Sequence, residues 1–281
     1  MDWLKRMEDA LEFIESKMNE PLDIEAIAKV AYSSPFHFQR MFHMLTGMTV
    51  AEYVRKRKLT LAAQELAVSP SKVVDVALKY GYNSPESFSK LFRKIHGISP
   101  SEARHSGVSL KAFPRLSFQL TIRGEKEVDY LIEEKESFTV MGKSATLICG
   151  NEGRTRQWFW GECQQDGTLA KIDSKQPDAP LLGITLNFNE NFTYLIGKKE
   201  EGEVPAVGLS LQRIPSSTWA VFPCSGPLPA AIQNRFRQIF QEWFPATEYE
   251  HAGLPEIEVY IPDKTEAEGY RSEVWIPVMK K

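Results

Sequence analysis

Hydrophobic residues recur at helical spacing through the first hundred positions. Between Asp2 and Met18 the apolar side chains fall on one face of a helix, and Asp2 can cap its start; they are Trp3, Met7, Leu11, Ile14 and Met18. A second helical pattern covers residues 22–31. Ser34 followed by Pro35 is typical of a helix start, so a third helix is expected from Pro35 to Leu45, with Gly47 ending it.

The same pattern returns 50 residues later. Helices are expected over 73–80 and from Pro85 to His96, with Gly97 as the stop. The pairs that match at this offset are Tyr32/Tyr82, Ser34/Ser84, Pro35/Pro85, Phe38/Phe88, Phe42/Phe92 and Gly47/Gly97. Each copy is followed by a capping box, Thr49–Glu52 or Ser99–Glu102, that predicts a new helix. A long helix from Val50 to Ala67 would join the two copies.

Two helices joined by a short turn form a helix-turn-helix, and this chain has two such units. The alternative is a pair of inert helical hairpins. The polar faces favour DNA binding, because the exposed positions of the two third helices carry mainly basic and amide groups: Gln39, Arg40, His43, Lys90, Arg93 and Lys94, with Glu86 the one acid. Eighteen residues of connecting helix span about 27 Å. That is near the roughly 34 Å between successive major-groove faces, so one chain could reach two adjacent segments of an asymmetric site.

From residue 115 the pattern changes to alternation. Leu116, Phe118, Leu120 and Ile122 alternate with polar residues and predict a strand. Further strands are expected over 138–149, 181–187, 192–197, 209–222, 256–261 and 272–278, and helices over 154–165 and 227–244. The two central strands would form a hairpin across Asn189-Glu190. The order is a duplicated β-α-β-β unit, an α+β domain with an antiparallel sheet, behind an all-α N-terminal domain. The expected division is 1–106, a linker at 107–114, and 115–281.

Charge is divided in the same way. The net charge is −3, yet Lys29 to Arg104 holds 12 Lys/Arg against 5 Asp/Glu, a balance of +7. From Lys111 onward 19 basic residues meet 24 acidic ones, a balance of −5. Screening confines these fields to about 8–10 Å, so the basic half is the one that can attract phosphate.

Both helix-turn-helix units resemble the AraC/XylS regulators. The first resemblance is carried by Phe36-His37-Phe38-Gln39-Arg40-Met41-Phe42, Gly47 and the run from Tyr53 to Leu59. The second is carried by the run from Val76 to Lys94, Gly97 and Ser99-Pro100. The resemblance covers residues 1 to about 106. It implies a bacterial transcription regulator, an activator or alternatively a repressor, and it places base contacts on the third helix of the first unit, with the matching helix of the second expected to do the same.

Base reading is expected from three residues on each third helix. Arg40 can donate twice to guanine, Gln39 can pair with adenine, and Phe36 can pack on a thymine methyl. In the second helix Glu86, Ser87 and Lys90 are the candidates, and Glu86 could equally be a solvated helix-start acid. The wider candidate set adds His43, Arg93 and Lys94. Arg55, Lys56, Arg57 and Lys58 are expected to contact phosphate or solvent.

The C-terminal half resembles the GyrI-like effector-binding domain, through Pro255–Pro262 and Ser272–Val278. This resemblance covers about 125–281 and implies an aromatic cavity with a glutamate at its base that binds bulky organic, often cationic, compounds. The residue types of this half agree with such a cavity, because a carboxylate among aromatic rings can bind an organic cation. The expected lining residues are Trp158, Trp219, Glu258, Tyr260, Glu273 and Trp275. Alternatively, these aromatics are core and the glutamates face water.

The leading hypothesis is a ligand-responsive regulator, not an enzyme. One alternative is a hydrolase that uses Glu258 or Glu273 as a general base, and another is a module that sequesters a protein. Cys149, Cys163 and Cys224 are isolated, so no metal site and no cofactor are expected. The expected partners are double-stranded DNA and a small-molecule effector, and RNA polymerase is a further candidate. No membrane span or secretory signal is found in the sequence, so we expect a cytoplasmic protein. The DNA-binding half could act as a single chain, so we expect a monomer or weak dimer.

Overall fold

The computed structural model describes residues 3–118, 127–148, 155–188, 191–200, 205, 207–262 and 271–280. The chain divides into two compact units. The first contains residues 1–35 and 50–122, and the second contains 36–49 and 123–281. Asp2, Cys149 and the expected turn Asn189-Glu190 lie outside the described residues.

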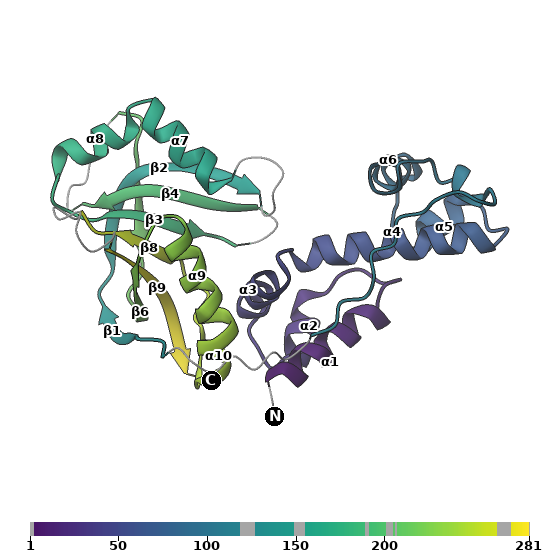
Figure 1. The fold of residues 1–281 in the computed structure, drawn as a ribbon, viewed down its shortest axis with the longest axis horizontal. Coiled ribbons are helices and arrows are strands. Elements are labelled where there is room, and N and C mark those ends of the chain that lie inside the picture. Colours follow the sequence, from purple (N-terminus) through teal and green to yellow (C-terminus); the bar gives the residue numbers. More distant parts are fainter. Residues whose placement is uncertain are drawn as a thin grey trace. The chain divides into compact units, whose positions relative to one another are not determined.

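The first unit is helical, as expected. Its elements are α1 (Trp3–Ser16), α2 (Ile24–Val30), α4 (Val50–Val68), α5 (Val73–Lys79), α6 (Pro85–His96) and the short 3₁₀ helix η1 (Glu102–Arg104). In Figure 1, α1 and α2 lie beside one part of α4, and α5 and α6 lie at its other end. The core at that end joins Leu59, Ala62 and Leu66 of α4 to Phe88 and Phe92 of α6.

Local sequence signals fix the ends of α6. The Ser84 hydroxyl accepts a hydrogen bond from the Ser87 amide at 3.2 Å, and Gly97 ends the helix with φ +80°. The bounds Pro85–His96 are confirmed. The Ser99–Glu102 capping box also forms, with the Glu102 carboxylate accepting from the Ser99 amide at 2.7 Å. Only a single 3₁₀ turn, η1, follows it, so the α-helix expected after this capping box is wrong.

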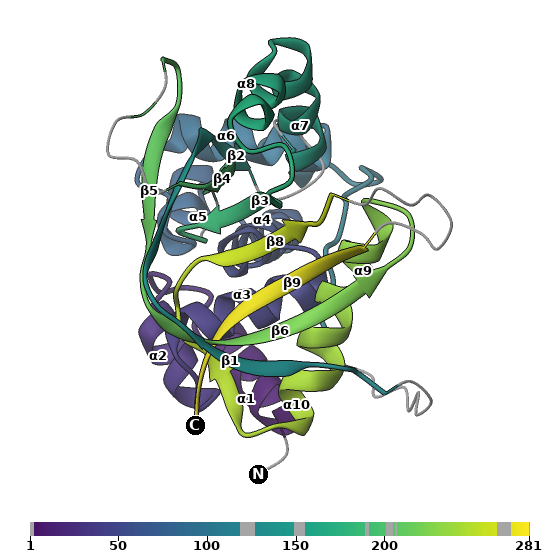
Figure 2. The same ribbon diagram turned by 90° about the vertical axis from the view of Figure 1, so that its left-hand side faces the viewer.

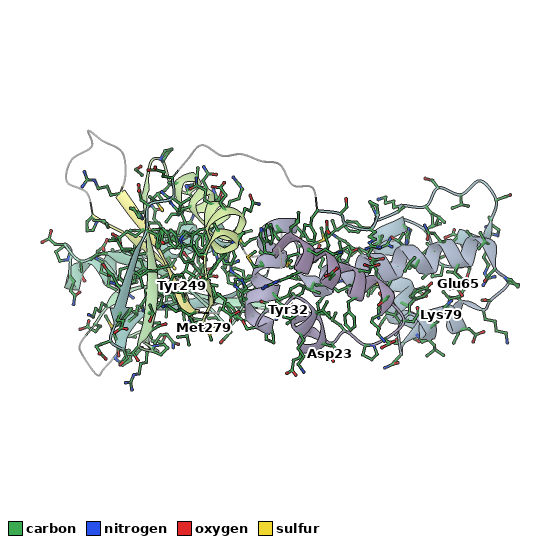
Figure 3. The ribbon with its side chains drawn as sticks, turned by 90° about the horizontal axis from the view of Figure 1, so that it is seen from below. Asp23, Tyr32, Glu65, Lys79, Tyr249 and Met279 are labelled. Carbon is green, nitrogen blue, oxygen red and sulfur yellow. The ribbon has the colours of Figure 1, made fainter. Side chains whose placement is uncertain are left out.

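The connecting helix α4 is 19 residues long and confirms the prediction. Its basic run serves the fold more than expected. Arg57 forms an ion pair with Glu15 of α1 at 2.8 Å and donates to the Phe113 carbonyl at 2.8 Å. Lys58 donates to the Glu20 carbonyl at 3.0 Å. The expectation that Arg57 and Lys58 contact phosphate or solvent is therefore wrong. At the other end, Lys79 pairs with Glu65 at 2.7 Å (Figure 3).

The second unit combines α3 (Pro35–Thr46) from position 36 onward with an α+β fold. Its strands are β1 (Leu131–Lys135), β2 (Phe138–Ile148), β3 (Leu181–Leu186), β4 (Asn191–Lys199), β5 (Ser210–Ile214), β6 (Ser217–Ser225), β7 (Tyr249–His251), β8 (Glu256–Tyr260) and β9 (Arg271–Lys280). Its other helices are α7 (Arg156–Gln165), α8 (Thr168–Lys175), α9 (Ala230–Gln238), the π-helical turn η2 (Ile239–Trp243) and α10 (Phe244–Ala246).

The strands form one antiparallel sheet in the order β1-β6-β9-β8-β3-β4-β2-β5, with β7 pairing β9. Figure 2 shows the run from β3 through β8, β9 and β6 to β1. Two copies of a β-β-α-β-β unit build it, and they meet where β3 pairs with β8. The first strand of each copy pairs with the other copy, β1 with β6 and β5 with β2. This exchange links the two copies, because β1 covers the outer edge of β6 and β5 covers the outer edge of β2.

Several sequence expectations need correction. Residues 115–118 are not a strand, because the Leu116 amide donates to the Tyr53 hydroxyl of α4 at 3.3 Å. The single strand expected over 209–222 is two strands separated at Pro215, which lacks the N–H a ladder needs. The helix expected over 227–244 is α9, η2 and α10 in succession. Helix α8 and strands β1 and β7 were not predicted. Among the described residues, no helix is both long and apolar enough to cross a membrane.

Candidate nucleic-acid interface and ligand cavity

Helix α6 presents its expected DNA-reading side chains to solvent. Glu86, Ser87, Lys90, Arg93 and Lys94 are all exposed, whereas Phe88 and Phe92 on the opposite side are fully buried. A surface groove runs along the exposed face and is lined by Glu86, Ser89, Lys90, Arg93 and Lys94. Glu86 lies in the first turn, where both readings of its role, a base contact and a helix-start acid, remain compatible with its position.

Helix α3 is placed differently. Its position 40 corresponds to Lys90 at the repeat offset, yet Arg40 is only 2% exposed. The Phe36 ring lies 4.6 Å from the His251 ring, measured between centroids, and the His43 ring lies 5.3 Å from Phe188. Gln39 is half-buried. The face of α3 that is expected to read bases therefore packs against the α+β part of the second unit in this conformation.

Arg40 forms a buried ion pair with Glu256 of β8. Its Nε and Nη2 both donate to the carboxylate, a bidentate arrangement in which both side chains are at most 3% exposed. The Gly253 amide donates to His251 Nδ1 at 3.0 Å, which leaves the proton on Nε2, 3.3 Å from Glu256. Burial alone would raise the pKa of the Glu256 carboxyl, but Arg40 and His251 hold it below its usual range.

A cavity of about 820 Å³ opens beside this ion pair. Its walls come from α3, α7 and α9, and β8 supplies its acidic floor; the charged and aromatic lining includes Arg40, Arg156, Trp160, Phe236, Glu258 and Tyr260. This size falls within the range of small-molecule sites, and the mixture of rings with a few convergent polar groups is typical of them. Of the expected effector residues, Glu258 and Tyr260 lie here.

Glu258 is the centre of a hydrogen-bonded cluster. Its Oε2 accepts from the Tyr194 hydroxyl at 2.5 Å and from the Tyr260 hydroxyl at 2.7 Å. Trp160 Nε1 donates to the Tyr194 oxygen at 3.3 Å. Burial raises the pKa of both tyrosines, and the neighbouring carboxylate raises it further, so both remain donors. The cluster presents a negative charge that is 3% exposed, framed by aromatic rings.

Arg156 of α7 lies against the same cluster. Its Nη1 is 3.4 Å from Glu258 Oε1, and its Nη2 donates to the Thr185 hydroxyl at 2.9 Å. The guanidinium carbon lies 5.2 Å from the Phe192 ring centroid and 5.3 Å from that of Tyr194. These distances are typical of cation–π contacts. The cavity therefore already holds a cation of the chain itself.

The remaining expected effector residues are elsewhere. Ile257 pairs with Trp275 and Val259 with Glu273 across β8 and β9, so Glu273 and Trp275 share the face opposite Glu258. Trp219 is fully buried in the core on that opposite face. Trp158 is 39% exposed, and Trp160, two residues further along α7, lines the cavity in its place. These four are therefore not brought together with Glu258.

Sequence reasoning missed several residues of the site. Glu256 was within reach, since it alternates with Glu258 and Tyr260 on one face of the predicted strand. Arg156, Tyr194 and Phe236 carried no local signal, because only the sheet pairing and helix packing bring them to β8. In the described part of the chain, no group of three or more His, Cys, Asp or Glu side chains could hold a metal ion.

Two family matches agree with this geometry. Residues 27–106 match a family described as "Helix-turn-helix domain". Residues 131–278, more than half of the chain, match the family "Integron-associated effector binding protein". A pair of helix-turn-helix units beside an effector-binding fold defines a DNA-binding transcription regulator. The chain belongs to the AraC family of these regulators and carries a GyrI-like effector-binding domain.

Two named regulators support the assignment to this family. Regulatory protein SoxS of Escherichia coli K12 is 36% identical over 105 residues, 37% of this chain and 98% of SoxS. The transcriptional activator AarP of Providencia stuartii is 39% identical over 98 residues, 35% of this chain and 73% of AarP. The solved structure of SAV2435 bound to tetraphenylphosphonium matches 54% of this chain and 94% of its own, at 23% identity and a TM-score of 0.46.

The hydroxyl of Tyr194 needs the space above Gly183. A Cβ at Gly183 would lie 2.1 Å from that hydroxyl. We expect Gly183→Ala to lower the free energy of unfolding by about 1–3 kcal/mol, the usual cost of overpacking. Adding Tyr194→Phe removes the clashing atom, so the double variant should be less destabilised than the sum of the singles. Urea denaturation of the four proteins measures this, and strict additivity would show that the predicted contact does not form.

The burial of His43 makes stability depend on pH. Burial lowers the pKa of His43 to about 4, and the nearby Arg40 and Arg156 add to the effect. The unfolded chain binds this proton at a higher pH than the folded chain, so stability is lost as pH falls from about 6.5 toward 4. His43→Gln should show a smaller drop in Tm between pH 7 and pH 5 than the natural chain. The exposed His105 provides the control, and an equal reduction in His105→Gln would contradict the assignment.

Proposed function

We propose that this regulator senses a bulky organic cation in the cavity above β8. The observation that carries the proposal is the Glu258 cluster, a carboxylate 3% exposed and surrounded by aromatic rings in a cavity of about 820 Å³. A buried carboxylate favours a cation by charge, and ring faces favour it by their quadrupoles. The contacts of Arg156 support this chemistry, because that guanidinium uses the rings and the carboxylate together.

Binding rather than hydrolysis is the reading we favour for this carboxylate. A general base must reach a substrate proton directly, yet Oε2 of Glu258 already accepts two phenolic hydrogen bonds. SoxS and AarP, named above, are also regulators. Contact with RNA polymerase and a monomeric or weakly dimeric state in solution are further parts of the proposal.

On DNA, we propose that α3 and α6 read two segments of one asymmetric site. Exposed Lys90 in α6 can reach a base, with Ser87 and Glu86 beside it and Arg93 and Lys94 close to phosphates. In α3 the reading residues would be Phe36, Gln39, Arg40 and His43, once this helix has separated from the α+β part of the second unit. Because the two helices differ in sequence, the two half-sites should differ as well.

Tetraphenylphosphonium is a suitable probe for the cavity, because it is bulky, aromatic and permanently charged. Isothermal titration calorimetry should show binding to the natural chain, and Glu258→Gln should weaken it by about tenfold or more, which is 1.4 kcal/mol. Tetraphenylborate has nearly the same shape with the opposite charge and is the matched control. Equal affinity for the borate, or no effect of Glu258→Gln, would refute a cation site at Glu258.

Lys90 tests the second reading helix. Selection from a random DNA library should yield a split, asymmetric site, and Lys90→Ala should lose about 1–3 kcal/mol of discrimination at one half only. Lys17→Ala removes the same charge from the exposed turn that follows α1 and should change neither half. If Lys90→Ala instead weakens binding equally to every sequence and only reduces the salt dependence, Lys90 contacts phosphate and does not read a base.

A further inference from the structure

Three arginines line the cavity, and two of them, Arg40 and Arg156, are bound as a cationic ligand would be. Arg156 pairs with Glu258, as described above. The Arg40 guanidinium carbon lies 4.5 Å from the Phe188 ring centroid, 5.2 Å from Phe240 and 5.5 Å from Phe236. It also pairs with Glu256 through two nitrogens. Ring faces and a buried carboxylate thus surround Arg40 in the arrangement expected for an organic cation.

The two arginines are physically linked. Arg156 lies 5.9 Å from the Phe236 ring centroid, so both guanidinium groups use the same ring. Each is matched by one glutamate of β8, at positions 256 and 258. Among the described residues that line the cavity, Glu258 is the one acid, and it is already paired. A further cation can therefore gain a full counter-charge only by displacing one of the chain's own.

Arg40 is also the residue with which α3 should read guanine. The corresponding Lys90 of α6 is exposed, so burial at this position is not a property of the helix-turn-helix itself. While Arg40 bonds Glu256 it cannot donate to a base. Phe36 and His43, at the same face of α3, are covered as well. The docked conformation therefore withholds one of the two proposed reading helices.

We propose that Arg40 is an internal ligand of the effector cavity, and that an organic cation frees α3 for DNA by competing with it. This inference rests on the proposed function of the cavity as a cation site. The incoming cation displaces Arg156 from Glu258 and competes with Arg40 for the face of the Phe236 ring, which both arginines use. It also places a positive charge next to Arg40, because α3 forms the adjoining wall. An anion would add a partner to Arg40 and leave Glu256 in place. A cation therefore favours the state in which α3 has left the cavity, whereas an anion favours the docked state.

The first test removes the counter-charge without touching DNA-reading residues. Glu256→Gln should bind the two-part DNA site about tenfold more tightly than the natural chain when no cation is present, within the usual range of coupling between sites. Tetraphenylphosphonium should tighten DNA binding by the natural chain and add nothing to the variant. Tetraphenylborate should not tighten either. Unchanged DNA affinity in a folded Glu256→Gln protein would overturn the proposal.

A disulfide supplies a second test that does not depend on the tolerance of the buried pair. A Cβ at Gly253 would lie 3.9 Å from the Phe36 Cβ, a distance within the range of a disulfide between Phe36→Cys and Gly253→Cys, and the φ of +75° at Gly253 adds backbone strain to the bridge. The oxidised double variant should bind DNA through α6 alone and ignore the cation, and reduction should restore the response. The reduced protein is its own control, and the two single variants show whether other thiols contribute. A disulfide that forms fully and leaves the cation response intact would overturn the proposal.

Direct calorimetry separates the two levels of failure. If tetraphenylphosphonium does not bind the natural chain, the proposed cation site fails and the release mechanism fails with it. If the cation binds and Glu258→Gln weakens it, but DNA affinity stays constant with and without the cation, the sensor site stands and the role of Arg40 is refuted.

Discussion

Two buried carboxylates on one short strand set the constraint on the second unit. Glu256 and Glu258 are 1% and 3% exposed, and they point to the same face of β8. A buried charge costs several kcal/mol unless it is paired and hydrogen-bonded. The chain meets this requirement with Arg40, His251, Arg156, Tyr194 and Tyr260, which come from α3, β7, α7, β4 and β8 itself. The placement of those elements around the cavity is thus coupled to two acid residues.

The duplicated sheet makes that arrangement possible. Strand β8 is central because the two β-β-α-β-β copies meet at the β3–β8 pair. The strand is thus bonded along both edges, to β3 and β9, while residues of α3, α7 and α9 line the cavity over its acidic face. The exchange of β1 and β5 between the copies covers β6 and β2, which would otherwise be the edge strands of the sheet. A rigid floor of this kind holds functional groups more accurately than a loop does.

Much of this architecture could be predicted from the sequence. The repeat at an offset of 50, the bounds of α6 and the length of α4 follow from local signals: a capping serine, a terminal glycine and helical periodicity. The β-α-β-β order likewise follows from alternation. The site was harder, because its members are joined by pairing register. Trp275 and Tyr260 both carried the expected residue type, yet the register of β8 with β9 puts them on opposite faces. Trp160 and not Trp158 lines the cavity for a similar reason, since residues two apart on a helix face different ways.

The burial of Arg40 could not be foreseen from its motif, since the same motif leaves Lys90 exposed. A buried ion pair is also a weak clamp, because the desolvation of both charges offsets much of their attraction. An apolar pair of similar volume would often hold the helix at least as firmly. It would, however, give a charged effector nothing to compete for. In the proposed mechanism the contact between α3 and β8 is therefore suited to switching more than to stability. Its strength depends on a counter-charge, and the same cavity offers a second cation the rings and the carboxylate beside it.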